Sequence, residues 1–426
     1  MSDWPKVRLG ELGAWYGGGT PSKNRPDFWA EGTFPWLSPK DMGPETLSGT
    51  RDQITQAAVD GSAARLISAN SVAVVVRSGI LERKLPVAVV PFVTTINQDM
   101  RALLPGPGVS PGWVAWALRA HEQQLLDTCR KRGTTVASLE GRRLMDFSIP
   151  LPDLPMQRRI VDILEDHLSR LDAAEAGLAA AGKRLGTMWM STLAHHTSSG
   201  RGLRLSDCLA YSIGGVWGEP AGAGEVDVRV LRVTELDRRG ELDPKTAAAR
   251  SVKRSQLASR SLRVGDLLLE KSGGGPTTPV GRVGLVRRPT EPSVCSNFMQ
   301  LMRPDPAVVL PEYLHAALMA FYVTGKTESL QKASTNIRNL RMPDYLATTV
   351  RVPDLADQRA RVAELARARE FSDGLARSVD RGRRRLAQLR RGLLEAAFTG
   401  RLVSHRSDVG IIESQELTAE APLSGP

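Results

Sequence analysis

The chain has 426 residues, which is long enough for two or three domains that each bury a core of their own. Its formal charge of +11 favours an anionic partner, and nucleic acid is the polyanion that a basic protein most often meets. The three cysteines, Cys129, Cys208 and Cys295, are far apart and odd in number, so the sequence supports neither a disulfide framework nor a zinc site.

The sequence has no stretch that resembles a signal peptide or a membrane span. The longest apolar run, residues 72–76, ends at Arg77 and is far shorter than the roughly 20 residues that a bilayer requires. We therefore expect a cytoplasmic protein without a membrane partner.

Residues 1–152 are predicted to form a first mixed α/β domain. Short β-branched runs between turn residues, at 72–76, 87–90 and 92–96, predict strands. Apolar residues at helical spacing, among them Trp113 and Ala117, predict a short helix over 111–120.

Residues 153–200 change character and predict one long helix. Apolar residues recur from Leu164 to Met188 at spacings that alternate between three and four, which is the seam of a coiled coil. A helix of about 44 residues would reach roughly 65 Å. In the alternative interpretation, each seam packs on its neighbouring globular domain.

The whole plan then repeats 201 residues later. The ten residues from Pro152 to Val161 return as Pro353 to Val362 without a gap. Residues 201–352 restate the first domain, with Lys271-Ser272-Gly273 aligned to Arg77-Ser78-Gly79. Such self-similarity predicts two similar domains held by two similar helices.

The second long helix is predicted over residues 353–403. Its three-four alternation is weakened only by Ser372 and Gly382, and two matching seams in one chain should pair. Residues 404–426 are polar without apolar periodicity and are predicted to be disordered.

Several catalytic motifs fail on inspection. Gly325-Lys326-Thr327 looks like the end of a phosphate-binding loop, but Ala320 stands where its first glycine is needed, and the run lies inside a helical pattern. Leu269-Glu270-Lys271 lacks the first acid of a metal-dependent nuclease. The Asn/Asp-Pro-Pro-aromatic run of DNA amino-methyltransferases occurs nowhere, and the pair His195-His196 is interpreted as solvated. We assign no catalytic, cofactor-binding or metal-binding residue.

Sequence-specific DNA binding uses Arg or Lys for guanine and Asn or Gln for adenine, among side chains that hold phosphates. Residues of these types fall in predicted loops of both domains. Each residue taken singly is equally explained as an ordinary solvated side chain, so the prediction of DNA binding rests on the two sets. In the first domain the candidates are Lys23, Asn24, Arg25, Lys40, Arg77, Arg83, Lys84, Arg130, Lys131, Arg132, Thr134 and Thr135. In the second domain they are Lys271, Ser272, Arg282, Lys332, Asn336, Arg338, Asn339 and Arg341.

Motifs along nearly the whole chain resemble the specificity subunits of type I restriction-modification enzymes. The family's opening is similar to Gly17-Gly18-Gly19-Thr20-Pro21-Ser22, and the second half is similar in Gly214-Gly215-Val216-Trp217-Gly218. Each half closes on a proline, a glutamine and a long helix, and the end resembles the family's in residues 393–402. Two positions depart from the pattern: Met156 replaces an acid that Asp357 keeps, and the first long segment ends in Leu193-Ala194-His195-His196.

The resemblance implies an α+β fold in which two similar target recognition domains are joined by two long helices. The helices would form an antiparallel coiled coil with a pseudo-twofold internal repeat, and each domain would read half of an asymmetric bipartite site in double-stranded DNA.

The resemblance also implies a non-catalytic chain that binds no cofactor itself. Its partners would be two methyltransferase subunits, which use S-adenosylmethionine, and restriction subunits in the full complex, which use ATP and Mg. Two alternatives stay open: a structural adaptor that does not read sequence, and a self-contained DNA-modifying enzyme with a divergent site.

Overall fold

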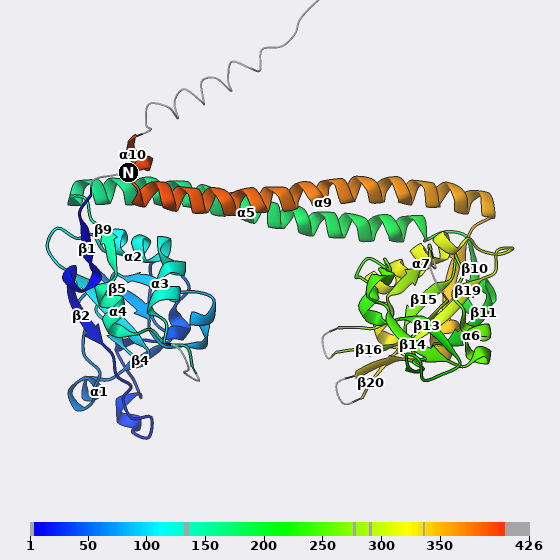
Figure 1. Cartoon of the computed structure of the whole chain (residues 1–426), viewed down its shortest axis with the longest axis horizontal. Helices are drawn as coiled ribbons and strands as arrows, with labels where there is room; N and C mark the ends of the chain where they lie inside the picture. The colour runs from blue at the N-terminus through cyan, green and yellow to red at the C-terminus, as the bar shows by residue number, and fades with distance from the viewer. Residues whose placement is uncertain (1–3, 132–135, 276–277, 289–291, 335–336, 405–426) are drawn as a thin grey trace, which may run out of the picture. The chain divides into compact units, whose positions relative to one another are not determined.

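The computed structural model describes residues 4–131, 136–275, 278–288, 292–334 and 337–404 (Figure 1). The chain forms two compact units: unit 1 comprises residues 1–176 and 383–426, and unit 2 comprises residues 177–382. Two long helices, α5 (Leu154–His196) and α9 (Leu355–Phe398), each contribute one part to either unit.

Unit 1 is built on a four-stranded antiparallel sheet of order β2-β8-β5-β6, beside a smaller sheet of order β4-β3-β7 and the pair β1-β9. Its strands are β1 (Lys6–Arg8), β2 (Gly13–Gly17), β3 (Phe34–Leu37), β4 (Asp52–Ile54), β5 (Ser71–Val75), β6 (Val87–Val90), β7 (Thr95–Ile96), β8 (Met100–Pro105) and β9 (Ser148–Pro150). Its shorter helices are α1 (Gln56–Gly61), α2 (Pro111–Ala120), α3 (Glu122–Cys129), α4 (Gly141–Asp146) and α10 (Arg401–Ser404).

The central strand β5 is buried on both faces, which explains its unbroken apolar sequence. Val72 and Val74 pack in the core that contains Trp113 of α2, while Ala73 and Val75 pack in a second core on the opposite face. The strands predicted over 72–76 and 87–90 and the helix over 111–120 are confirmed. The strand predicted over 92–96 is shorter: Thr95–Ile96 pairs with β3, and Thr94 forms an isolated bridge with Ile67.

Unit 2 repeats this plan and adds to it. Its sheets have the orders β11-β19-β15-β17 and β12-β14-β13-β18, with the pair β10-β22 and an additional sheet of order β16-β21-β20. The strands are β10 (Arg201–Arg204), β11 (Leu209–Gly214), β12 (Glu219–Pro220), β13 (Val226–Leu231), β14 (Ala248–Val252), β15 (Leu267–Glu270), β16 (Ser272–Gly274), β17 (Val283–Leu285), β18 (Ser293–Cys295), β19 (Met299–Pro304), β20 (Gln331–Ser334), β21 (Ile337–Leu340) and β22 (Thr349–Val352). The shorter helices are α6 (Arg254–Arg260), α7 (Pro311–Val323) and α8 (Met342–Leu346).

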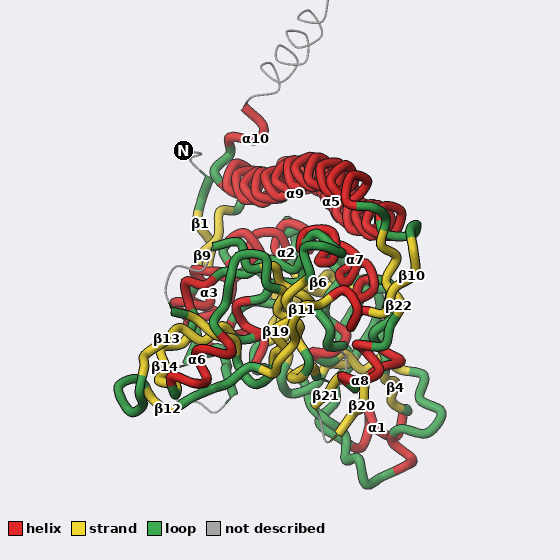
Figure 2. Tube along the Cα trace, turned by 90° about the vertical axis from the view of Figure 1, so that its right-hand side faces the viewer, coloured by secondary structure: helices red, strands yellow, loops and turns green. Residues whose placement is uncertain are grey.

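The sheets of the two units correspond strand by strand. β11, β19, β15 and β17 take the places of β2, β8, β5 and β6, and each unit has a parallel pair in its second sheet, β3–β7 and β13–β18. Figure 2 shows the strand pairs β1–β9 and β10–β22 in yellow, each leading to the long helices of its own unit.

The long helices run antiparallel in each unit. In unit 1 Arg390 of α9 pairs with Asp172 of α5, and in unit 2 Glu364 of α9 lies 3.2 Å from His196 of α5. Gly382 fits this packing, because a Cβ there would lie 2.9 Å from Leu178 Cδ1. The predicted fold class, two mixed α/β domains and two paired long helices, is confirmed.

The predicted seam is only partly a helix–helix seam. Leu164 and Leu168 are buried in the globular core of unit 1, and Leu365 is buried in that of unit 2. Leu375 and Leu389, which the three-four spacing places in the seam, are 38% and 50% exposed. Partial exposure at these two positions is expected where only two helices pack together, because a two-helix seam is covered less completely than a globular core. The predicted domain boundaries at 152, 200, 352 and 403 stay predictions, since the compact units divide the helices instead.

The glutamine of the repeated motif joins each globular domain to its long helix. Gln157 is fully buried, its Oε1 accepts from Ser110 N at 2.8 Å, and its Nε2 donates to Pro152 O at 2.7 Å and to Gly108 O at 3.0 Å. One side chain thus holds the loop before α2 against the start of α5.

Gln358 makes the corresponding contacts in unit 2. Its Oε1 accepts from Leu310 N at 2.7 Å, and its Nε2 donates to Pro353 O and Val308 O. The substitution of an acid by Met156 leaves the helix start unchanged, because Asp153 accepts from Met156 N at 2.8 Å just as Asp354 accepts from Asp357 N at 2.8 Å.

Candidate nucleic-acid interface

The additional sheet of unit 2 brings several of the predicted DNA-binding residues together. Its register places Ser272, Asn339 and Lys332 side by side on strands β16, β21 and β20. The Ser272 hydroxyl bonds to the Asn339 side-chain oxygen. Lys271 directly precedes this row and Arg338 adjoins it, so the sheet gathers hydroxyl, carboxamide and cationic groups, the types that contact base edges and phosphates.

Two residues that the sequence did not mark belong to the same group. The Lys271 ammonium lies 3.5 Å from Gln300 Oε1, and Gln300 Nε2 donates to Ser212 Oγ at 3.0 Å. The backbone oxygen of Phe298 accepts from Lys271 N at 3.0 Å, and the Phe298 side chain is 44% exposed. An exposed ring among polar groups offers an apolar contact to a base or a sugar. Gln300 lies inside strand β19, whereas the residues predicted from the sequence were those of loops.

Arg282 does not belong to this group. Its guanidinium forms a bidentate pair with Glu270 at 2.8 and 2.9 Å and donates to Leu236 O at 2.7 Å, and both side chains are nearly buried. Hydrogen bonding to Glu270 raises the pKa of Arg282. We leave Arg282 out of the proposed surface because it satisfies a buried carboxylate.

The remaining candidates of unit 2 are Arg341 and Asn336. Arg341 follows β21, lies 3.1 Å from Asp344 and donates to Ser329 O at 2.8 Å, while its side chain stays partly exposed. It therefore lies at the end of the sheet and is not paired in register with Ser272. Asn336 lies outside the described residues.

Arg77 of unit 1 occupies the position of Ser272. The amides of Val76 and Arg77 both donate to Asp99 O, at 2.8 and 3.2 Å, as the amides of Lys271 and Ser272 donate to Phe298 O. Arg77 bridges to Ser138 as Ser272 pairs with Asn339. The sequence alignment of Arg77 with Lys271 was therefore wrong by one residue, because it matched basic side chains while the backbone pairing sets the register.

Arg130 and Lys131 lie beside this position. Lys131 N donates to Ser138 O at 2.8 Å, and its side chain is exposed. Arg130 pairs with Glu82 at 3.0 Å, which places it close to the exposed Arg83 and Lys84 that follow. Arg132, Thr134 and Thr135 of the same loop lie outside the described residues.

The other candidates of unit 1 lie near the smaller sheet. Lys23 and Asn24 form an exposed turn, and Arg25 pairs with Asp27 at 2.6 Å while stacking over the Phe28 ring at 4.1 Å. Lys40 pairs with Asp52 of β4. Among the described residues, no hydrogen bond or ion pair connects them with Arg77, so the structure divides the predicted set of unit 1 into two groups.

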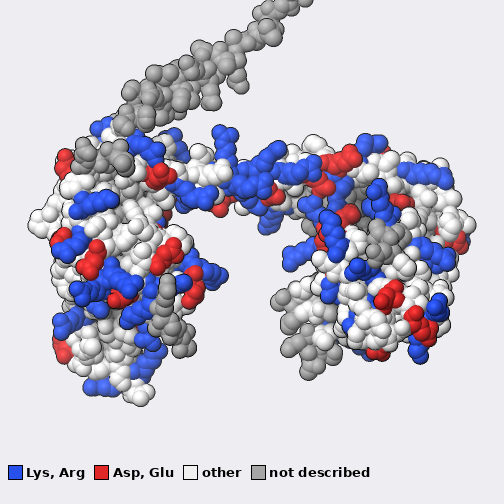
Figure 3. Space-filling view, in the orientation of Figure 1, with Lys and Arg blue, Asp and Glu red and all other residues white. Residues whose placement is uncertain are grey.

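Figure 3 shows Lys and Arg gathered along the visible face of the long helices, and both signs of charge mixed over the globular parts. Arg384 and Arg385 are exposed on α9. They belong to the helix and not to the sheets that carry the candidate base-contacting groups.

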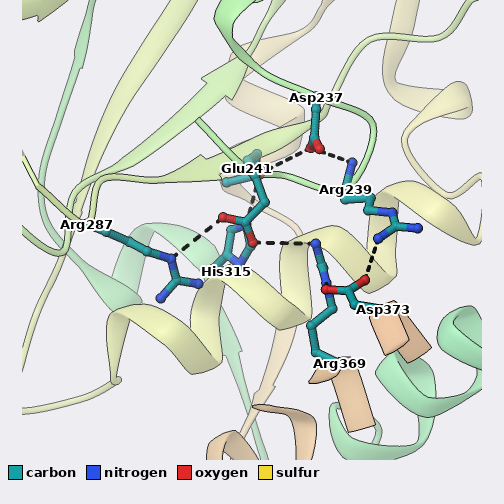
Figure 4. Close-up of polar contacts among 8 residues, drawn as sticks. Asp237, Arg239, Glu241, Arg287, His315, Arg369 and Asp373 are labelled. Atoms are coloured by element: carbon teal, nitrogen blue, oxygen red, sulfur yellow. Dashed lines mark hydrogen bonds and ion pairs between the residues drawn. The ribbon is translucent and has the colours of Figure 1, made fainter. Parts of the chain in front are cut away.

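A cluster of charged side chains in unit 2 links the globular part of this unit to α9 (Figure 4). Glu241 lies 3.7 Å from Arg287 and 3.6 Å from Arg369, and Asp373 accepts from Arg239 and from Arg369. A loop of the domain is thereby fixed to the helix by charge pairs.

Beside this group, His315 of α7 bonds through Nε2 to Val283 O at 3.0 Å (Figure 4). Burial lowers the pKa of His315 to about 4, so the imidazole is neutral near pH 7. His196, which we interpreted as solvated, instead lies against Glu364 with its side chain only 19% exposed.

The described residues contain no group of three or more His, Cys, Asp or Glu side chains that could hold a metal ion. Gly325-Lys326-Thr327 forms a turn after α7 ends, which corrects the expectation of a helical position. In the described parts of the chain, no helix combines the length and apolar character that crossing a bilayer requires.

Comparison with known proteins agrees with this organisation. Residues 1–180 match the family described as "Type I restriction modification DNA specificity domain". The matched segment contains the first globular domain and the first part of α5. The resemblance drawn from the sequence motifs is confirmed.

Curated relatives of this specificity family match part of the chain. The EcoR124I/EcoR124II specificity subunit of Escherichia coli is 42% identical over 170 residues, which are 40% of this chain and 42% of that protein. The MjaIX specificity subunit of Methanocaldococcus jannaschii is 26% identical over 165 residues, 38% of this chain and 37% of that protein. The matches thus span about two fifths of these relatives' length.

Solved structures of type I systems share the fold along nearly the whole chain. A chain in a structure titled as the basis of complex assembly and conformational transition of the type I R-M system has a TM-score of 0.74 at 19% identity, covering 93% of this chain and 98% of that one. The HsdS subunit from Thermoanaerobacter tengcongensis has a TM-score of 0.55 at 18% identity, covering 93% and 97%. At these identities the likeness concerns the fold.

Proposed function

We propose that this chain is the DNA sequence-specificity subunit of a type I restriction-modification complex, which reads an asymmetric bipartite site and docks the methyltransferase and restriction subunits. One observation carries the proposal: two sheets of the same topology present different side chains at equivalent positions. Arg77 in unit 1 stands where Ser272 stands in unit 2. Two domains of the same topology that carry different side chains at equivalent positions suit the reading of two different half-sequences.

In this proposal each unit combines base contacts with phosphate contacts. Ser272 and Asn339 offer donors and acceptors to base edges, while Lys332 and Lys271 supply cations that hold the backbone of the duplex. In unit 1, Arg77, Lys131 and the residues around them supply the same two kinds of contact, to base edges and to phosphates. The phosphate contacts make binding weaken as the salt concentration rises.

The proposal assigns chemistry and cofactors to the partner subunits. Two methyltransferase subunits would bind S-adenosylmethionine and modify adenine, and restriction subunits would use ATP and Mg. The chain itself would bind no cofactor and would act in the cytoplasm. The antiparallel helices would set the distance between the half-sites, which we expect to lie about 10 base pairs apart, one turn of the duplex.

The test is to co-express the chain with the methyltransferase subunit encoded beside it in the genome and to map modified adenines by single-molecule sequencing. We expect a split motif with a fixed gap that disappears when this chain is omitted. A continuous motif, or modification that persists without the chain, contradicts the proposal. Methylation by the purified chain alone would favour a self-contained enzyme.

A structural adaptor is the second candidate function, and it is favoured by apolar side chains on α9. Phe371 and Leu375 are 63% and 38% exposed, as expected of a face that docks another protein. An adaptor predicts unchanged sequence preference when Arg130, Lys131 and Arg132 are all replaced by alanine. Our proposal predicts weaker reading of the first half-site with the second half-site still read.

A further inference from the structure

We propose that Arg101 is a specificity-determining residue that reads a guanine in the first half-site. The inference rests on the proposed function and names a side chain and a base for it. Arg101 lies in β8, the second strand of the main sheet of unit 1, and was not among the residues that the sequence marked.

The register of the main sheets makes Arg101 the counterpart of Gln300. Arg101 pairs with Gly17 of β2 on one side and with Val74 of β5 on the other. Gln300 pairs in the same way with Gly214 of β11 and Leu269 of β15. Both side chains therefore leave the same place on the sheet, next to the segments that carry Arg77 and Ser272.

The side chains at this position have different surroundings in the two units. Gln300 is 9% exposed, and its carboxamide is bonded to Lys271 and to Ser212. In unit 1 the positions of Lys271 and Ser212 are held by Val76 and Trp15, as the backbone pairing shows. Val76 has no polar side-chain atom, and the Trp15 indole N–H donates to Leu9 O at 2.8 Å. The internal partners that bind Gln300 are thus missing for Arg101.

Arg101 is accordingly exposed, and among the described residues its side chain has no hydrogen bond, ion pair or ring contact. Other arginines of the same unit are engaged: Arg77 lies 3.6 Å from Asp99, and Arg130 lies 3.0 Å from Glu82. A guanidinium with five free donors keeps its full capacity for an external ligand.

The sheet also determines where this guanidinium lies. A Cβ on Gly17 would lie 2.7 Å from Arg101 Nη1, so the group lies over the glycine of the adjacent strand. A side chain on a rigid strand positions its donors better than one on a loop. The planar fork matches the O6 and N7 acceptors of guanine, and this pair is the commonest specific contact in the major groove. A lysine retains the charge and loses the fork.

The experiment compares Arg101→Ala and Arg101→Lys with the unsubstituted chain, each co-expressed with the methyltransferase subunit. Modified adenines are mapped by single-molecule sequencing, and melting of each complex shows that it is folded. Arg142→Ala is the matched control, because Arg142 belongs to the same unit and is 91% exposed.

We expect both Arg101 variants to accept other bases at one guanine of the first half-sequence, with discrimination there falling roughly tenfold to a hundredfold. The second half-sequence and the gap should stay unchanged, as should the whole motif of the control. If Arg101→Lys keeps the motif while Arg101→Ala only lowers modification evenly, the side chain contacts phosphate and the assignment is wrong. An unchanged motif in both variants also overturns it. If the unsubstituted chain gives no split motif, the proposed function fails, and the assignment fails with it.

Discussion

At the scale of single residues, neighbouring side chains decide which arginines of the sheets keep their donors available for a ligand. Arg101 lies in a strand, and Arg282 lies next to one. Arg282 forms a buried pair with Glu270, whereas Arg101 is exposed and unpaired among the described residues. Composition and loop position cannot separate the two cases. The partner of Arg282 stands 12 residues away, on the neighbouring strand, and is brought close only by sheet pairing.

The buried glutamines give a prediction about stability. Gln157→Ala removes a side chain that accepts one bond from Ser110 N and donates two to backbone carbonyls in a fully buried site. Leaving these groups unpaired should lower the free energy of unfolding of unit 1 by about 2–4 kcal/mol. Calorimetry of the purified chain should show a lowered first-unit transition. Gln123→Ala is the control, because Gln123 is exposed and its side chain donates to the exposed Asp127; an equal loss in both variants would contradict the account.

His315 gives a prediction about pH. Its pKa is about 4 in the folded chain, and an unfolded histidine has a pKa of about 6.5, so the unfolded state binds the proton first as the pH falls. Stability from this group is complete above about pH 6.5 and is lost progressively down to about pH 4. At pH 5 the loss should be about 1–2 kcal/mol.

The measurement is the melting temperature of unit 2 between pH 7.5 and 5. His315→Gln should reduce the pH dependence, and replacement of the exposed His167 should leave it unchanged. The same slope in His315→Gln as in the unsubstituted chain would show that another group is responsible.

At the scale of elements, the repeat predicted the long helices well, because a three-four apolar spacing without proline has few alternatives. The sequence could not show that Leu164 and Leu168 pack in a globular core while Leu389 is exposed, since the spacing is the same for both environments. The alignment of Arg77 with the second unit was also wrong by one residue, because it matched Arg77 to Lys271 and not to Ser272. Backbone bonds to Asp99 decide that register, and side-chain similarity does not report them.

The paired helices give a prediction about spacing. Deleting residues 173–176 from α5 and 374–377 from α9 removes about one helical turn, roughly 6 Å, from each helix. In the proposed function this should change the gap between the half-sites by about two base pairs and leave both half-sequences intact. Methylome sequencing decides the outcome, and altered half-sequences with the original gap would refute the ruler.

At the scale of the whole molecule, unit 1 depends on residues from both ends of the chain. Phe398 of α9 is buried against Trp113, with ring centroids 4.6 Å apart, and Ala397 lies fully buried in the same core. Phe398→Ala should therefore destabilise unit 1 by about 3–5 kcal/mol and leave unit 2 unchanged. Separate calorimetric transitions would report this. Leu389→Ala, at a half-exposed position of the same helix, should have a much smaller effect.

The discontinuity of unit 1 has a consequence for biosynthesis. Domains commonly fold in the order in which the ribosome releases them, the N-terminal one first. Here unit 2 is one continuous segment, whereas the core of unit 1 is complete only after Phe398 has been synthesised. The domain translated first is thus finished last, so a truncated or stalled chain exposes the apolar core of unit 1 that Ala397 and Phe398 cover in the complete chain.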